Sequence, residues 1–218
     1  MKVGIIDYKC GNIQSVENAL VHLGHEVFRI KSPSELNDYS VIVLPGVGAF
    51  GPAMESLRES GFIEPLNKIV EGGETTIVGI CLGMQLMCNV SFEHGKHIGL
   101  GWIDAEVRPI REFDADIKVP HIGWNDIEFT KEGVGFGTQF NGKDFYFVHS
   151  FCVKANDQNQ VVAECTYGSK FACIVRNHRV IGIQFHPEKS QDLGLRLLDQ
   201  AIRIGISLDE GCLEVSHA

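Results

Sequence analysis

Several features that would indicate particular classes of protein are missing from this sequence of 218 residues. Lys and Arg number 19 against 28 Asp and Glu and form no dense cluster, so a nucleic-acid backbone has no basic surface to bind. The seven cysteines are scattered without a Cys-x-x-Cys pair, and no His-x-x-x-His spacing occurs. Neither a disulfide framework nor a zinc site is therefore indicated. We expect no nucleic-acid partner, no metal and no cofactor.

No hydrophobic run is long enough to cross a membrane, and the first seven residues are too short an apolar segment for a signal peptide. The chain also lacks a Pro/Ser-rich linker, a low-complexity tract and an internal repeat. Hydrophobic residues make up 44% of the sequence, which is enough to bury a core without metal or disulfide support. We expect one domain over residues 1–206, a frayed tail over 207–218, no membrane partner and a cytoplasmic location.

The first half of the chain alternates β-branched runs with helical patterns. The expected strands are residues 3–6, 26–30, 41–44 and 75–80, and the expected helices are residues 14–23, 52–58, 63–70 and 82–90. Repeated strand and helix alternation is typical of a mostly parallel sheet with helices on both faces. The predicted class is α/β, with a twisted central sheet.

The second half has shorter runs separated by Gly, Asn and Asp. Strands are expected at residues 103–107, 118–122, 126–129, 145–148, 161–165, 172–175 and 180–183. They predict a smaller antiparallel or mixed sheet. A last helix, over residues 194–204, carries apolar residues at helical spacing and is expected to cover one face of the sheet.

The sharpest local pattern is Gly79-Ile80-Cys81-Leu82-Gly83, a strand that runs through G-x-C-x-G into a helix. It is the thiol form of a nucleophile elbow, in which small flanking residues permit a strained turn that exposes the nucleophile. The start of a helix favours a thiolate, and the N–H of Leu82 is placed to donate to an oxyanion. The alternative, for this and for the other cysteines of the sequence, is that the side chain is simply buried in the hydrophobic core. For Cys81 we favour the interpretation as a nucleophile over that as a core residue.

A cysteine nucleophile needs a base, and residues 180–190 offer a strand that ends in His186-Pro187-Glu188. The imidazole can take the thiol proton, and the carboxylate can fix the tautomer of the ring. Active sites of open α/β sheets lie at the carboxyl ends of strands, where both segments end. We expect Cys81, His186 and Glu188 to meet there.

One other motif competes with this interpretation. Residues 46–51 read G-x-G-x-x-G after a strand, the pattern of a dinucleotide-binding loop. Pro45 and Pro52 flank it, it follows the third strand rather than the first, and the acidic residue about 20 positions on, Glu71, falls at a helix end. We prefer a tight loop whose backbone N–H groups face the active site as further oxyanion donors. A third alternative is a non-catalytic binding subunit.

The motifs as a set resemble the class I, or triad, glutamine amidotransferases, and are similar to the glutaminase subunits of imidazole glycerol phosphate synthases. The resemblance runs from Met1 to about Ile204. Its motifs are residues 6–8 (IDY) with Gly11, Asn12 and residues 15–16 (SV), residues 45–50 (PGVGAF), 79–85 (GICLGMQ), 120–125 (PHIGWN), 145–150 (FYFVHS) and 184–191 (QFHPEKSQ).

The resemblance implies Cys81 as nucleophile, His186 as base and Glu188 as the group that orients the base, with the carboxamide of glutamine attacked to give a thioester and ammonia. It implies an oxyanion hole and a set of substrate contacts. The oxyanion hole would combine Leu82 with the loop at Val47 and Gly48, which is thought to need reorientation. The substrate would be held by Gly46, Gln85, Glu93, Ser150 and Phe151.

The resemblance also implies a partner, a (β/α)8-barrel cyclase that forms a heterodimer with the glutaminase and receives its ammonia. Four residues match the interface positions of the family: Asn12, Trp124, Tyr146 and Lys189. From the sequence alone, both aromatic residues are equally compatible with a core position.

One segment departs from the family pattern. Lys9 and Cys10 stand where the histidine-pathway family has a small residue and an apolar one. Lys9 is close to the expected docking face. The sequence therefore leaves two acceptors open: the cyclase that makes imidazole glycerol phosphate and AICAR in histidine biosynthesis, or a paralogous synthase that amidates a bacterial surface sugar.

Overall fold

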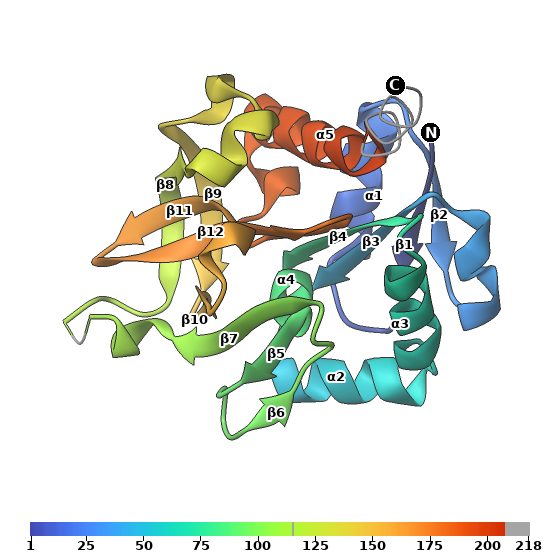
Figure 1. Cartoon of the computed structure of the whole chain (residues 1–218), viewed down its shortest axis with the longest axis horizontal. Coiled ribbons are helices and arrows are strands. Elements are labelled where there is room, and N and C mark those ends of the chain that lie inside the picture. The colour runs from blue at the N-terminus through green and yellow to red at the C-terminus, as the bar shows by residue number, and fades with distance from the viewer. Residues whose placement is uncertain (115, 208–218) are drawn as a thin grey trace, which may run out of the picture.

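The strands of the computed structural model, which describes residues 1–114 and 116–207, form one mixed sheet (Figure 1). Its parallel half has the order β2-β1-β3-β4-β13. The strands of this half are β1 (Lys2–Ile6), β2 (Glu26–Ile30), β3 (Val41–Gly46), β4 (Thr76–Cys81) and β13 (Val180–Ile183). The predicted α/β class with a mostly parallel central sheet is confirmed.

The sheet continues from β13 through pairs that are antiparallel except for β7 and β5, which are parallel, and a branch leaves it at β12. The main path runs through β12 (Ser169–Asn177), β10 (Phe151–Ala155), β7 (Ile103–Pro109), β5 (Cys88–Ser91) and β6 (His97–Ile98). The branch consists of β11 (Val161–Tyr167), β8 (His121–Phe129) and β9 (Lys143–His149). The antiparallel strands expected in the second half are therefore hydrogen-bonded to the parallel half through β12.

Alternating side chains of the central strands build two hydrophobic cores, one on each face. On β3, Val41 and Val43 belong to one core, whereas Ile42 and Leu44 belong to the other. The first core is covered by α1 (Ile13–His22) and α5 (Gln191–Ser207), and the second by α2 (Phe50–Glu59) and α3 (Ile63–Gly72) (Figure 1). Because both faces are covered, the central strands are continuous apolar runs.

The helix expected over residues 82–90 is wrong in its second half. α4 (Leu82–Leu86) is a single turn and a half, and β5 begins two residues later. The carbonyls of Leu86 and Met87 accept hydrogen bonds from the N–H groups of Leu100 and Trp102, both at 2.8 Å. These tertiary bonds replace the bonds that would continue the helix. The local sequence pattern does not reveal them.

Three other expectations need correction at element ends. The strands predicted at 118–122 and 126–129 are one strand, β8, which begins at His121. A strand was not predicted at β10, because only Ser150 separates it from β9; the chain changes partner there from β8 to β7. α5 begins before the predicted residue 194 and extends through Ser207, the first residue of the predicted tail. Residues 208–218 lie outside the described residues.

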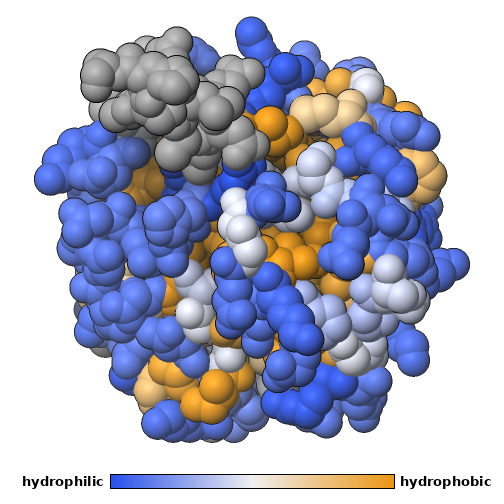
Figure 2. Space-filling view, turned by 45° about the vertical axis from the view of Figure 1, so that its right-hand side comes forward, coloured by the Kyte–Doolittle hydropathy of each residue, from blue (hydrophilic) through white to orange (hydrophobic). Residues whose placement is uncertain are grey.

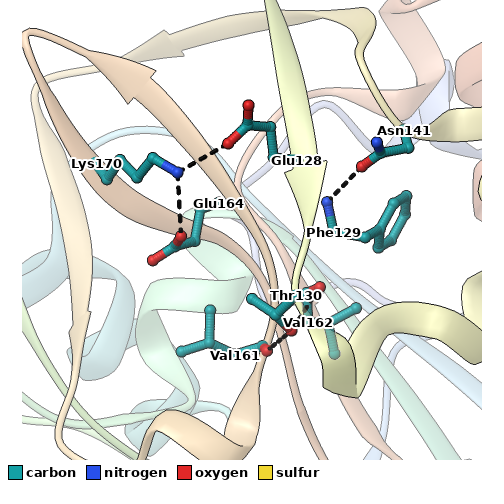
Figure 3. A network of polar contacts seen from close by, with 8 residues as sticks. All are labelled: Glu128, Phe129, Thr130, Asn141, Val161, Val162, Glu164 and Lys170. Carbon is teal, nitrogen blue, oxygen red and sulfur yellow. Dashed lines mark hydrogen bonds and ion pairs between the residues drawn. The ribbon is translucent and has the colours of Figure 1, made fainter.

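Polar contacts join side chains of neighbouring strands in the antiparallel branch (Figure 3). Lys170 of β12 reaches across β11 to Glu128 of β8, with Nζ to Oε2 at 2.8 Å, and also lies 3.8 Å from Glu164 of β11. At the end of β8, the N–H of Phe129 donates to Asn141 Oδ1 at 2.8 Å. These exposed ion pairs add little stability, and they join residues that the backbone pairing of the three strands brings close together.

The surface seen in Figure 2 is mainly hydrophilic, with hydrophobic groups visible in small areas between polar side chains. Single exposed apolar residues of this kind are usual in folded proteins. Within residues 1–114 and 116–207, no helix has the length and apolar character needed to cross a membrane.

The crossing of α4 over β3 leaves no room for a side chain at Gly83. A Cβ atom there would lie 1.9 Å from the carbonyl oxygen of Leu44, a backbone atom that cannot move without disturbing β3. We expect Gly83→Ala to lower the free energy of unfolding by about 3 kcal/mol or more, measured by urea denaturation.

Gly72→Ala is the matched control, because a Cβ atom at Gly72, the last residue of α3, has no neighbour within 4 Å. This variant should unfold within about 1 kcal/mol of the parent. Equal urea midpoints for the two variants would contradict the close crossing at Gly83.

Candidate active site

Cys81 occupies a strained turn between β4 and α4. Its backbone has φ 53° and ψ −110°, a region that residues with a Cβ atom rarely adopt. Gly79 and Gly83 make the turn possible, because a Cβ atom on Gly79 would lie 2.6 Å from the methyl of Met87 and 2.8 Å from the carbonyl carbon of Gly83. The predicted elbow is present. The following helix has only five residues, so its dipole adds little to the stability of a thiolate. The turn itself determines where the thiol lies.

His186 and Glu188 follow β13, which pairs in parallel with β4 so that Ile183 lies opposite Ile80. This register brings both strand ends to one edge of the sheet, as expected for Cys81 and His186. His186 Nδ1 lies 2.8 Å from Glu188 Oε1, and the two side chains are only 3% and 1% exposed. Since Nδ1 is bonded to the carboxylate, Nε2 is the ring nitrogen left to exchange a proton with Cys81, which lines the same cavity.

The backbone around His186 is held in place by neighbouring elements. The N–H of His186 donates to the carbonyl of Tyr146 at 2.9 Å, and the hydroxyl of Ser190 donates to the carbonyl of His186 at 2.7 Å. Ser190 Oγ in turn accepts the N–H of Tyr146 at 2.9 Å. The imidazole is therefore fixed both through its ring and through its backbone.

The environment of His186 favours the imidazolium. Burial lowers its pKa, but the hydrogen bonds and charges of Cys81 and Glu188 raise it more, so the pKa rises from 6.5 to about 9. A protonated imidazole beside a sulfur nucleophile is the form that can deliver a proton to a leaving amine.

A cavity of about 400 Å³ opens in front of this group. It is lined by Val47, Gly48, Cys81, Leu82, Gln85, Glu93, Pro120, Val148, His149, Ser150, Phe151, His186 and Lys189. Most of the predicted catalytic, oxyanion and substrate residues thus share one cavity. Two do not line it: Glu188 lies behind His186, and Gly46 packs against Leu82 and Gly83, so closely that a Cβ atom would lie 2.8 Å from the nitrogen of Gly83.

Two polar side chains of the cavity are fixed by hydrogen bonds. Glu93 Oε2 accepts the N–H of Phe50 at 2.7 Å. Gln85 Nε2 donates to the carbonyl of Phe151 at 3.0 Å and to Gln184 Oε1 at 3.1 Å. Gln184 Nε2 in turn lies 3.8 Å from the sulfur of Cys81. One predicted residue, Gln85, is therefore connected to the nucleophile.

Sequence reasoning assigned no individual role to three residues beside this site. Gln184 contacts Cys81, His149 lines the cavity, and buried Tyr8 donates its hydroxyl to the carbonyl of Pro45 at 2.8 Å, next to the Val47 loop. All three lie in or next to motifs of the resemblance, but spacing alone does not show which members of a motif face a cavity.

The predicted interface residues lie on the surface around this edge of the sheet. Trp124 is 45% exposed, which excludes a core position for its ring, and it packs edge to face on half-buried Tyr146, with ring centroids 5.9 Å apart. Asn12 and Lys189 are exposed, and Lys189 also lines the cavity. Ile122, 59% exposed and two residues from Trp124, is an apolar surface residue that the sequence did not single out.

Comparison with known proteins shows the family to which the chain belongs. The family model described as "Glutamine amidotransferase class-I" matches residues 4–202. A solved glutamine amidotransferase superposes with a TM-score of 0.69 at 22% identity, covering 91% of this chain and 98% of that one. The PurLQS structure from Thermotoga maritima superposes with a TM-score of 0.72 at 20% identity, covering 93% and 98%. The chain belongs to the class I glutamine amidotransferases.

Curated relatives show to which family within this class the chain belongs. Imidazole glycerol phosphate synthase subunit HisH 1 of Campylobacter jejuni is 45% identical over 93% of this chain and 100% of that protein. Subunit HisH of Helicobacter hepaticus is 44% identical over 91% and 96%, and subunit HisH 2 of Nitrobacter winogradskyi is 41% identical over 93% and 98%. Within its class the chain is a member of the HisH family of glutaminase subunits, and it is an enzyme subunit with glutaminase activity.

The raised pKa of His186 predicts a pH dependence of stability. Because the native state holds this proton more tightly than the unfolded chain, the stabilisation is complete below pH 6.5 and is lost as the pH rises through about 9. We expect the unfolding free energy, measured in urea, to decline between these pH values, and to decline less in Glu188→Gln, which lacks the carboxylate charge.

His22→Gln is the control, since it removes an exposed histidine of α1 and should leave the decline of the parent unchanged. An identical decline in Glu188→Gln and the parent would show that the carboxylate does not hold the proton.

Proposed function

We propose that this chain hydrolyses glutamine through a thioester on Cys81 and passes the ammonia to a synthase subunit. The observation that carries the proposal is the position of Cys81 at a strained turn, beside the His186–Glu188 pair and on the wall of a cavity of about 400 Å³. A cavity of that volume suits a small amino acid, and its side walls offer charged and amide groups at fixed positions.

In the proposed reaction, the sulfur of Cys81 attacks the carboxamide carbon of glutamine, and the carbonyl oxygen gains the negative charge. The N–H of Leu82 and backbone N–H groups at Val47 and Gly48 stabilise that oxyanion. His186 gives its proton to the amide nitrogen, the C–N bond breaks, and ammonia leaves. His186 then takes a proton from water, which attacks the thioester and releases glutamate and the thiol.

Substrate binding follows from the groups already fixed in the cavity. Glu93, whose other oxygen is held by Phe50, offers a carboxylate to the α-ammonium group of glutamine. Gln85 lies beside the nucleophile and offers an amide to the carboxamide. The backbone at Ser150 and Phe151 binds the rest of the amino acid, and Gly46 keeps the oxyanion loop against Leu82.

The proposed partner is a (β/α)8-barrel cyclase that makes imidazole glycerol phosphate and AICAR in histidine biosynthesis. Three observations support it: the names of the relatives, the exposed Trp124 and Ile122 side by side on β8, and the exposed Lys189 at the mouth of the cavity. A partner docked there would cover the cavity and carry ammonia away from water. Asn12 and Tyr146 complete the proposed contact surface.

Cys81→Ala should abolish the release of glutamate, by about 10³-fold or more, because no other group in the cavity can form the thioester. Glutamate formation by the purified chain is the measurement. Cys165→Ala is the control: it removes a buried thiol on β11 outside the cavity and should keep the parental rate. Parental activity in Cys81→Ala would refute the thioester mechanism.

The acceptor is tested by mixing the chain with the histidine-pathway cyclase of the same genome, with and without the ribulose intermediate which that cyclase binds. For a cognate pair we expect glutamate release to rise about tenfold or more when the intermediate is present, as coupling between two sites of one complex requires.

Unchanged release would argue against this acceptor, provided that Cys81 still reacts with a glutamine analogue. The paralogue that supplies a surface-sugar synthase would then be preferred. The exposed Lys9, which has a left-handed backbone (φ 67°) in the segment that departs from the family, is the observation that favours this second candidate.

A further inference from the structure

Two buried histidines outside the proposed triad face each other across the β8–β9 pair. Figure 1 shows these two strands side by side. His121 and His149 are register partners, 2% and 7% exposed. His121 Nδ1 lies 3.1 Å from His149 Nε2, and His149 Nδ1 lies 2.8 Å from the carbonyl oxygen of Phe151. Buried polar groups joined in this way form a continuous chain of hydrogen bonds that ends at the wall of the cavity.

The direction of donation in these hydrogen bonds follows from the last acceptor, the carbonyl oxygen of Phe151. A carbonyl oxygen only accepts, so the proton of His149 is on Nδ1, and Nε2 carries a lone pair. His121 must then donate through its own Nδ1. Burial lowers the pKa of His121 to about 4 and that of His149 to about 3, so both rings are neutral at pH 7 and each carries one proton.

The same carbonyl of Phe151 connects the histidines to Gln85. It accepts a second hydrogen bond, from Gln85 Nε2 at 3.0 Å, and Gln85 Nε2 also donates to Gln184 Oε1 at 3.1 Å. Both hydrogens of that amide nitrogen are used, which leaves Oε1 as its free polar atom. The reversed amide would place its oxygen against two other acceptor oxygens, an arrangement that costs two hydrogen bonds.

We propose that His121 is a positioning residue: through His149 it fixes the position of the Phe151 carbonyl, which together with Gln184 Oε1 holds the Gln85 amide with its oxygen toward the substrate, so that the site selects a carboxamide over a carboxylate. Gln85 lies at the carboxamide end of the cavity, because its partner Gln184 contacts the sulfur of Cys81. The NH2 group of glutamine can donate to Gln85 Oε1. The carboxylate of glutamate, at the same place, can only accept and is repelled. The inference rests on glutamine being the ligand of this cavity.

The surroundings of His121 hold its ring in the orientation that its hydrogen bond to His149 requires. The ring stacks on Tyr167 and on Phe147, with centroid distances of 3.9 and 4.9 Å. A phenyl ring at this position keeps the stacking and removes only the donor. His121→Phe is therefore the variant that isolates the hydrogen bond, and His121→Asn, with a side-chain N–H near the place of Nδ1, is the variant that should restore it.

The test measures binding of glutamine and of glutamate by calorimetry in the full chain carrying Cys81→Ala, so that no turnover occurs. Adding His121→Phe should raise the Kd for glutamine about tenfold, without raising that for glutamate, so the preference for glutamine falls about tenfold. His121→Asn should recover most of the preference. Tyr167→Phe, which keeps the stack and loses only a hydroxyl bonded to the carbonyl of Lys118, should retain it fully.

The outcomes separate this inference from the proposed function. No glutamine binding by Cys81→Ala alone would refute the proposed substrate. Binding by that variant together with a parental glutamine preference in folded His121→Phe would overturn the positioning role. Where His121→Phe does not fold, 15N NMR of the imidazoles in the parent decides: Nδ1–H tautomers of both rings are expected, and an Nε2–H tautomer of His149 would overturn the inference.

Discussion

The turn at Cys81 is the constraint on which the rest of this site depends. A residue with a Cβ atom is held at φ 53°, and this conformation persists only because the surroundings leave no alternative: Gly83 lies against the backbone of Leu44, and Gly79 lies beneath the turn. These close approaches join β3, β4 and α4 into one rigid unit. The sulfur is therefore presented to the cavity from a closely packed turn.

Pairing of β4 with β13 supplies the second half of the site. The two strands are far apart in the sequence, yet the parallel register that opposes Ile80 to Ile183 brings the residues after them to one edge. The His186–Glu188 pair is then buried, and its proton is bound tightly because both neighbours carry or develop negative charge. The approach of His186 to Cys81 is thus a consequence of sheet register, whereas the turn at Cys81 is a local feature.

Polar groups behind the cavity are also held in fixed orientations by hydrogen bonds, at some distance from the reacting atoms. Hydrogen bonds run from His121 through His149 to the carbonyl of Phe151, where they meet those of Gln85 and Gln184. Each member is buried or nearly so, and each bond limits the tautomer or amide orientation of the next. This series of hydrogen bonds begins at His121 on β8, the strand whose exposed residues are proposed to contact a partner.

The sequence by itself determined the α/β class, the elbow at Cys81 and the His-x-Glu segment, because β-branched runs, flanking glycines and short motifs are local properties. Placing Cys81 near His186 required only the rule that strand ends share an edge. The early end of α4, the strand β10 and the exposure of Trp124 were decided by tertiary structure, since the carbonyls and faces concerned find their partners far along the chain. The same holds for His121 and Gln184: their motifs were visible, but which atom bonds to which depends on strands that only the folded sheet brings together.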